Sequence, residues 1–359
     1  MELQWPLILF TTFVAWSAGL FATQCVMACK QAAPKTQTLS WVAAAVLLVV
    51  GGIAVFLHLE HWERIFNGFG HITSGITQEL IAIVVLAVVA IVYLVFLRKS
   101  DDGGSVPRWL AIVGIVVSAV LVIVMAHSYM MPARPAWDSP FWVLCVLGNA
   151  CVLGPATFLI LMSVKDEPIG CATAPEKTVT AVTASGSDAA GATSATAADA
   201  AADATATAEA ATAPSTGSEA AAAAIAVSEK DAKQGSVFAT VLMYWGSIAN
   251  AVASILYIVS MAFATSSLAD VGHYFDPTHP NEPMLEVADF SPFSGENLLI
   301  VLLGVVLIGT AAPIICSIMG KKKGDWTKWA AVALVCAVIG AICVRVAFYN
   351  MGASIFMLY

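Results

Sequence analysis

The sequence predicts an all-α membrane protein, a bundle of eight transmembrane helices with the N and C termini on the outer (periplasmic or extracellular) side. Hydrophobic residues make up 59% of the 359 residues and charged residues only 11%. A soluble fold of this length cannot bury so much apolar side chain, whereas a bilayer accommodates it. Lys and Arg gather in alternate loops between the apolar runs, the pattern that orients multi-pass proteins. The acidic net charge of −8 argues against a nucleic-acid partner.

Eight runs of about 20 apolar residues are each long enough to cross the hydrocarbon core at roughly 1.5 Å per residue. The first run follows no basic segment, so we interpret it as a retained helix rather than a cleaved signal peptide. Gly154-Pro155 and Pro313 lie inside runs, where neighbouring helices can satisfy the freed carbonyls, and we expect kinks rather than breaks. The predicted helices are Pro6–Cys29, Leu39–His58, Ile76–Leu97, Pro107–Met130, Pro140–Ser163, Gly235–Ala264, Asn297–Met319 and Trp326–Tyr349.

A segment of different composition separates the fifth and sixth runs. Residues 166–234 are mostly Ala, Thr, Ser and acidic residues, with almost no large apolar side chain. Such a composition cannot build a core, so we predict a disordered, low-complexity cytoplasmic linker. The chain then divides into residues 1–165 with helices one to five, the linker, and residues 235–359 with helices six to eight.

The loop charges predict the orientation. Basic residues are frequent after the first, third, fifth and seventh runs and rare in the opposite loops, where residues 265–296 contain none. Since basic loops stay in the cytoplasm, we place both termini outside and expect a multi-pass protein of the cytoplasmic (inner) membrane. The basic residues of the predicted cytoplasmic loops include Lys30, Lys35, Arg98, Lys99, Arg108, Lys165, Lys321, Lys322, Lys323 and Lys328.

Ionisable residues at membrane depth are costly and are candidates for function. His58 and Glu79 lie on consecutive antiparallel helices joined by a short loop, so they can face one pocket. A His that accepts a proton beside a carboxylate that passes it on suits quinol oxidation, in which two protons leave with two electrons. The alternatives are an interfacial His58, a Glu79 favoured by the helix dipole and an Arg345 that anchors the interface. The candidates at the outer edge are His58, Arg64, Asn67, His71, Glu79, His127, Arg345 and Tyr349.

Metal and haem sites are not expected in this chain. A bis-histidine haem needs paired ligands on facing helices, but only His58 and His127 lie inside apolar runs, both at the outer edge. The eight cysteines form no CxxC pair, which argues against an iron–sulfur cluster. The acidic residues and histidines of residues 265–296 lack the tight spacing of a metal site, so we expect a solvated or partner-docking loop.

Four stretches of the chain, taken in order, resemble one protein family. They are Gln4–Thr11; Leu57–Leu59 with Arg64–Asn67 and Gln78–Ile81; Trp137–Pro140 with Leu153–Pro155; and Arg345–Asn350. Together they resemble the membrane anchor subunit of the dimethyl-sulfoxide-reductase family (the DmsC family) over the whole hydrophobic chain. One departure concerns Glu60-His61-Trp62, where the family usually has Gly and then Pro after His-Leu. We therefore do not carry the family's loop shape over to this chain, and Glu60 and His61 become further candidates for the proton path.

This resemblance implies a haem-free anchor that binds menaquinol near the outer membrane face. It implies that residues matching His58 and Glu79 take part in quinol binding, and that electrons pass to a ferredoxin-type iron–sulfur subunit and then to a molybdopterin catalytic subunit. We expect Arg64, Asn67, Arg345 and Tyr349 to orient or bind the quinol.

Three rival interpretations stay open: a haem b-containing quinol-oxidising anchor, a secondary transporter and a structural tether. The transporter would use Asn149 and Asn250 as its interior polar groups, because substrate sites of transporters lie near the bilayer midplane.

Overall fold

The computed structural model describes residues 3–57, 71, 73–100, 105–169, 216–271, 291–352 and 354, with the side chains of residues 216–236 and 265–271 left out. All regular structure in this described part is helical, and eight of its helices are long and apolar enough to span a bilayer. The chain divides into one unit of residues 1–171 with 229–359 and a second unit of residues 172–228. Of the second unit only residues 216–228 are described, as helix.

The eight predicted spans are confirmed, with ends that differ by a few residues. One larger difference is the helix of the sixth span, which begins at Thr216 rather than at Gly235, because the intervening Ala-rich sequence has a high helix propensity. The predicted disorder of the linker stays a prediction for residues 170–215. The spans are α1 (Trp5–Cys29), α2 (Pro34–Phe56), α3 (Gly75–Lys99), α4 (Arg108–His127), α5 (Pro140–Val164), residues Val237–Ala264 of α6 (Thr216–Val271), the continuous α7 (Gly295–Leu299), η3 (Ile300–Ala311) and α8 (Ala312–Lys323), and α9 (Trp326–Asn350).

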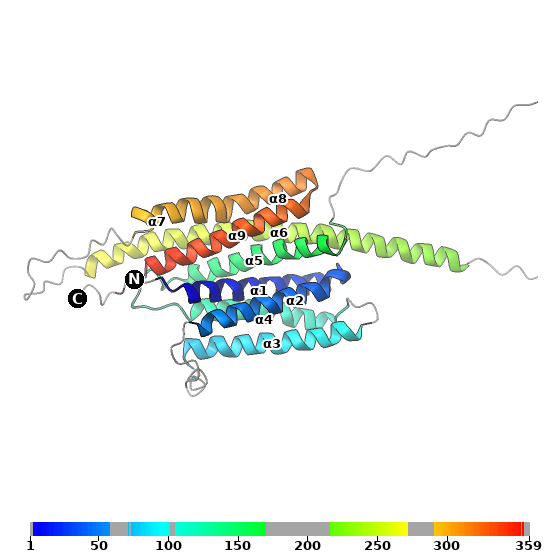
Figure 1. Ribbon diagram of the computed structural model, residues 1–359, viewed down its shortest axis with the longest axis horizontal. Helices are drawn as coiled ribbons and strands as arrows, with labels where there is room; N and C mark the ends of the chain where they lie inside the picture. Colours follow the sequence, from blue (N-terminus) through cyan, green and yellow to red (C-terminus); the bar gives the residue numbers. More distant parts are fainter. Residues whose placement is uncertain are drawn as a thin grey trace, which may run out of the picture. The chain divides into compact units, whose positions relative to one another are not determined.

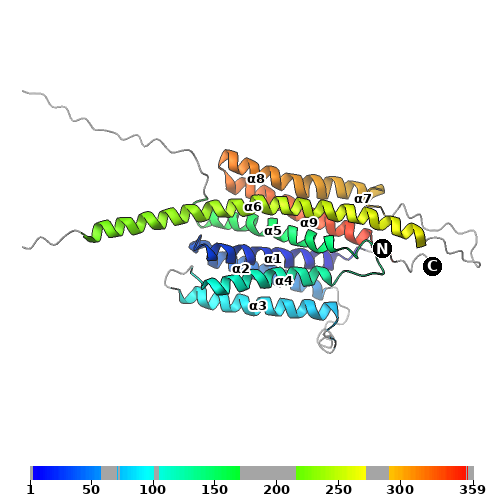
Figure 2. The ribbon, with the colours of Figure 1, turned by 180° about the vertical axis from the view of Figure 1, so that it is seen from behind.

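Helix α1 lies in the middle of the bundle and packs against α2, α4 and α5. Helix α3 packs on α4 at one edge, and η3 and α8 pack on α9 at the other, as Figures 1 and 2 show from opposite sides. The start of α1 and the end of α9 lie at the same end of the bundle (Figure 1). We call this the Glu79 end, since α3 also begins there.

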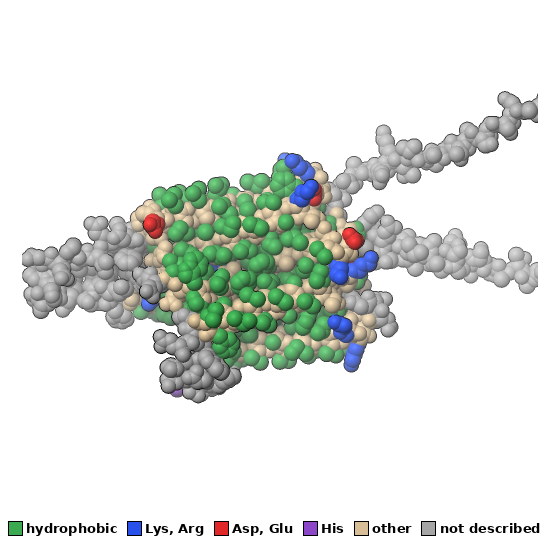
Figure 3. All heavy atoms as spheres, in the orientation of Figure 1, with side chains coloured by type: hydrophobic (Ala, Val, Ile, Leu, Met, Phe, Trp, Pro, Cys, Tyr) green, Lys and Arg blue, Asp and Glu red, His purple; other side chains and the backbone are tan. Residues whose placement is uncertain are grey.

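The opposite end carries most of the basic side chains visible in Figure 3, and an apolar surface lies between the two ends. We call it the lysine end, and its residues include Lys30, Lys99, Lys165 and Lys321. The alternation of basic loops predicted from the sequence therefore corresponds to one basic end of the bundle.

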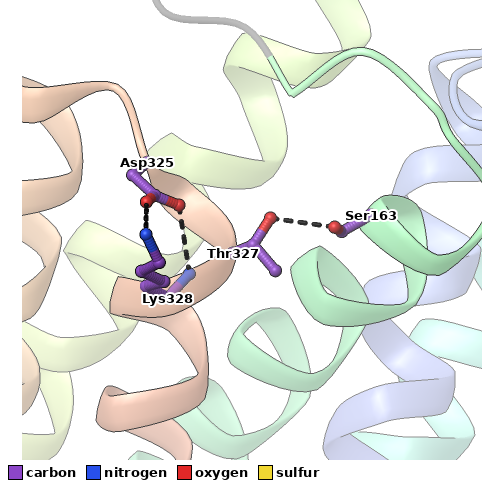
Figure 4. Close-up of polar contacts among 4 residues, drawn as sticks. All are labelled: Ser163, Asp325, Thr327 and Lys328. Atoms are coloured by element: carbon purple, nitrogen blue, oxygen red, sulfur yellow. Dashed lines mark hydrogen bonds and ion pairs between the residues drawn. The ribbon is translucent and has the colours of Figure 1, made fainter.

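At the lysine end, side chains fix the starts of two helices. Asp325 caps α9: its carboxylate accepts a hydrogen bond from the backbone N–H of Lys328 and pairs with the Lys328 ammonium at 2.7 Å (Figure 4). The hydrogen bond from the Lys328 side chain lowers the pKa of Asp325. Thr327 donates to Ser163 of α5 at 2.9 Å, which joins the two helices (Figure 4).

The buried carboxylate of Glu167 fixes the start of α2. It accepts from the backbone N–H of Lys35 at 2.7 Å and from the Thr36 hydroxyl at 2.6 Å. An anionic group at a helix N-terminus is favoured by the helix dipole and satisfies free N–H groups there. Glu167 lies within the range predicted as linker, and the sequence analysis gave it no role.

Both prolines inside the spans have their freed carbonyls covered by α6. Helix α5 continues through Pro155, and the carbonyl of Cys151, which a non-proline residue 155 would bond, lies directly against Gly246. The carbonyl of Gly309, freed in the same way by Pro313, accepts the side-chain amide of Asn250 at 3.0 Å. The twelve-residue π-helix η3 ends just before Pro313, and nothing in the sequence analysis predicted it.

Helices α1 and α5 cross at backbone contact. A Cβ atom on Gly154 would collide with the carbonyl of Gly19, and a Cβ on Gly19 would collide with the carbonyl of Ala150. Small residues allow this close approach, which is a common source of helix association in bilayers. The crossing therefore depends on glycine at both positions.

A seam of buried polar side chains joins α6 to α5 and α8. Three of its contacts are Cys145–Ser254 at 3.6 Å, Asn149–Asn250 at 2.8 Å and Ser247–Ser317 at 3.3 Å. Interhelical hydrogen bonds in bilayers each contribute about 0.6 kcal/mol on average. The seam stabilises the packing of α6–α9 against α1–α5.

Replacing Gly154 with Leu is expected to destabilise the bundle by about 3 kcal/mol, the upper part of the range for overpacked sites, because the new side chain meets backbone on α1. Gly52→Leu is the matched control, since a Cβ on Gly52 meets no atom within 4 Å. Thermal unfolding of the two variants in detergent checks this. Equal loss of stability would contradict the assigned crossing.

Candidate functional site

A buried carboxylate lies at the Glu79 end. Glu79 is in the second turn of α3 and only 7% exposed. Its Oε2 accepts from the Ser128 hydroxyl at a long 3.4 Å, while Oε1 has no hydrogen-bond partner among the described residues. Gly75 packs tightly on Ser128 and so fixes the start of α3 against the end of α4. In the described residues the unpartnered Oε1 distinguishes Glu79 from the structural Glu167, whose two oxygens both accept hydrogen bonds, and this difference favours a functional Glu79.

Two tyrosines lie near both Glu79 and Arg345. Tyr129, just after α4, and Tyr349, near the end of α9, each lie within electrostatic range of both Glu79 and Arg345. Tyr349 is 6% exposed, and its hydroxyl has no hydrogen-bond partner in the described residues. Unpartnered buried polar atoms are rare in folded proteins, and each calls for an explanation such as a bound ligand or water.

An aromatic wall backs the tyrosines. The ring of Phe348 stacks between Trp137, at 4.5 Å, and Trp142, at 4.2 Å. Trp137 also donates to the carbonyl of Phe348 at 2.6 Å, and the guanidinium of Arg134 lies 4.3 Å from the Trp137 ring. The indole N–H of Trp142, in contrast, has no partner in the described part of the bundle. The wall therefore presents one donor that has no partner in the described residues.

Arg345 lies deeper, roughly 8 Å along α9 from Asn350 at 1.5 Å per residue. Its guanidinium is 1% exposed. It donates to the hydroxyl and the carbonyl of Thr11 at 2.9 and 3.2 Å, to Asn149 Oδ1 at 2.8 Å and to the carbonyl of Ala341 at 2.8 Å. An interfacial anchor would extend its charge to the headgroups, so that alternative for Arg345 is wrong.

Asn149 and Asn250 extend this network across the bundle. Asn149 Nδ2 donates to Asn250 Oδ1, and Asn250 Nδ2 donates to the carbonyl of Gly309. The network thus joins α1, α9, α5, α6 and η3. These are the two residues that a transporter would need for its substrate, but here they hydrogen-bond each other, Arg345 and the backbone.

A model of the DMSO reductase anchor subunit (DmsC) family matches residues 1–351. The chain belongs to this family. No curated protein and no solved structure matches the chain. As a member of the DMSO reductase anchor family, the chain is a multi-pass membrane protein that anchors a DMSO-reductase-type complex and associates with the other subunits of that complex.

The structure brings together only some of the site residues predicted from the sequence of this anchor. Glu79 and Tyr349 share one neighbourhood, with Arg345 one helical turn below Tyr349. His58, Arg64 and Asn67 lie outside the described residues, as does most of the acidic loop after α6. The two other described candidates, His71 and His127, are exposed at the same end.

Sequence analysis missed Ser128, Tyr129 and Trp142 as members of the site. Ser128 and Tyr129 follow His127 directly, but only the packing of α3 on α4 brings them to Glu79. Trp142 lies near the start of the fifth span and is only 2% exposed. The available signal was the run of polar residues at the end of the fourth span.

A second buried polar cluster lies at the lysine end. Gln24 donates to the carbonyl of Gln37 at 2.9 Å, and Tyr93 donates to Gln37 Oε1 at 2.9 Å. Gln24, a polar residue within the first predicted apolar run, was the signal for this cluster in the sequence. It joins α1, α2 and α3, and its main consequence is structural.

The two buried glutamates are predicted to respond oppositely to replacement by Leu. Glu167→Leu should lower the free energy of unfolding by roughly 1–3 kcal/mol, because two donors lose their acceptor. Glu79→Leu should leave stability unchanged or raise it, because it removes an oxygen that has no partner in the described residues. Thermal unfolding of the purified anchor checks both. A loss for Glu79→Leu as large as for Glu167→Leu would make Glu79 a structural residue.

Proposed function

We propose that this anchor binds and oxidises menaquinol at the Glu79 end and passes the electrons to a ferredoxin-type iron–sulfur subunit. That subunit would feed a molybdopterin catalytic subunit of the DMSO-reductase type. The observation that carries the proposal is the Glu79 carboxylate, buried beside Ser128 with one oxygen unpartnered among the described residues. A buried carboxylate at the edge of an apolar bundle is energetically costly, and such residues are therefore candidates for function.

The surrounding groups suit quinol oxidation. A quinol must be held by hydrogen bonds and must release two protons as two electrons leave. Glu79 accepts a proton in this scheme, and the free hydroxyl of Tyr349 and indole N–H of Trp142 are donors for a quinol oxygen. Menaquinol, rather than another quinol, is assigned from the family resemblance alone.

His58 completes the proposed proton path, on the strength of the family resemblance. His58 follows Leu57, the last described residue after α2, and the next described residue is His71, just before α3. His58 would hydrogen-bond the quinol and accept its second proton, while Arg64 and Asn67 would orient it. The anchor itself is proposed to hold neither haem nor an iron–sulfur cluster.

We further propose that the Glu79 end faces outward. The basic residues gather at the opposite end (Figure 3), and basic loops of multi-pass proteins remain in the cytoplasm. Quinol protons would then leave on the outer side of the cytoplasmic membrane.

In the assembled complex, Glu79→Gln is expected to lower quinol-dependent acceptor reduction by at least about 100-fold, the lower range for loss of a general base. Activity with reduced viologen, which delivers electrons without quinol, should be unchanged. Glu296→Gln is the matched control, because Glu296 is an exposed glutamate at the same end. Wild-type quinol oxidation by the Glu79→Gln complex would refute the proposed role.

His58→Ala is expected to abolish quinol oxidation while all subunits still co-purify, because the role proposed for this histidine is in substrate binding and not in subunit assembly. The control is His127→Ala, which removes an exposed histidine of the same end and should keep activity. Retained quinol oxidation in the His58→Ala complex would remove His58 from the site.

A further inference from the structure

Arg345 carries a positive charge inside the bundle without a carboxylate partner in the described residues. Its four hydrogen bonds all end on neutral oxygens, those of Thr11, Asn149 and Ala341. A charged side chain within a membrane-spanning helix is costly. A bundle that needed only to tie α1, α5 and α9 together could do so with neutral side chains, so the charge itself calls for a role.

The titratable groups near Arg345 do not neutralise it. They are Cys145 on α5, Tyr349 on α9 and Tyr129 after α4, and thiols and phenols are uncharged at neutral pH. Thr11 is the neighbour from α1. Glu79 lies within range of the two tyrosines, but it neither pairs with nor hydrogen-bonds Arg345.

The hydrogen bonds of the Asn149 and Asn250 side chains determine which amide atom faces Arg345. They place a neutral oxygen there, so the charge of Arg345 is not compensated. A backbone carbonyl can only accept, so Asn250 must present its NH₂ group to Gly309 and its oxygen to Asn149. Asn149 must in turn present its oxygen to Arg345. An Asp at position 149 would have nearly the same shape but would form a buried ion pair.

The charge lies close to the two donors of the proposed site that have no partner in the described residues. The Arg345 guanidinium is 6.0 Å from the ring of Trp142, whose N–H is unpartnered in the described bundle. Tyr349, with a free hydroxyl, is one turn further along α9. Donors backed by a positive charge favour an oxyanion, whereas the free Oε1 of Glu79 is an acceptor and favours a hydroxyl hydrogen.

We propose that this site selects the singly deprotonated form of the quinol, and that Arg345 is a positioning residue that stabilises the anionic quinol oxygen. The inference rests on the proposed function and deepens it. On binding, one quinol O–H bond breaks and its proton goes to the Glu79 carboxylate, which leaves the quinol mono-anion. Two electrons then pass one at a time to the iron–sulfur partner subunit, and the second hydroxyl proton is released to solvent at the Glu79 end, which yields the quinone.

Two matched ligands test the charge preference: 2-hydroxy-1,4-naphthoquinone, ionised at neutral pH, and 2-methoxy-1,4-naphthoquinone, which stays neutral. Binding to the purified complex is measured by quenching of tryptophan fluorescence and by competition with menaquinol. The wild-type complex is expected to bind the ionised compound about tenfold more tightly, which corresponds to a coupling of about 1.4 kcal/mol. The preference should disappear at a pH where the hydroxyl compound is protonated.

The decisive variants are at position 149. Asn149→Asp should abolish the preference, because a carboxylate beside Arg345 cancels its charge, whereas the neutral Asn149→Ser should keep it even if both ligands bind more weakly. If Arg345 had only a structural role, Asn149→Asp would change the affinities for the two ligands equally. Equal binding of the two ligands to the wild type, or an unchanged preference in a folded Asn149→Asp complex, would overturn the proposal. Failure of both ligands to bind the wild type would refute the quinol site itself.

Discussion

The hydrogen bonds of Arg345 are the interaction on which the rest of this bundle depends. A guanidinium at membrane depth has no water to satisfy it, so the protein must supply oxygens from several helices. Thr11 on α1 and Asn149 on α5 supply them, and Asn149 is held by Asn250, which is held by the carbonyl of Gly309. One charge thereby sets the mutual positions of five helical segments.

The apolar surroundings also determine the rest of the packing. Because lipid tails are as apolar as the helix surfaces, no hydrophobic driving force brings the helices together, and association depends on small residues and interhelical hydrogen bonds. Gly19 and Gly154 bring two backbones together, Gly246 covers the carbonyl freed by Pro155, and Asn250 binds the one freed by Pro313. The polar atoms that still lack partners in the described residues are then the informative ones, and Glu79, Tyr349 and Trp142 contribute three of them at one end.

The sequence predicts the eight spans well because the length of an apolar run can be read locally, and the thickness of the bilayer sets the length that a span needs. It also identifies Glu79, since an ionisable residue at the edge of an apolar run is conspicuous. It does not predict the direction of Arg345, the pairing of Asn149 with Asn250 or the capping of α2 by Glu167, because these depend on how each helix is rotated. A helix with apolar residues on every face shows little hydrophobic periodicity, so the sequence does not indicate which face points into the bundle. The π-helix η3 is not predicted either, because its one carbonyl shown to bond another helix, that of Gly309, accepts from Asn250, which is distant in the sequence.

In the proposed reaction the buried carboxylate of Glu79 takes a proton from the quinol. Infrared difference spectra of the assembled complex, recorded on oxidation of bound menaquinol, measure this most directly, because a protonated carboxyl has a C=O band distinct from that of a carboxylate. We predict a carboxyl band that is present in the wild type and in Glu296→Gln and absent in Glu79→Gln. An unchanged band in the Glu79→Gln complex would contradict the account, since another group would then take the proton.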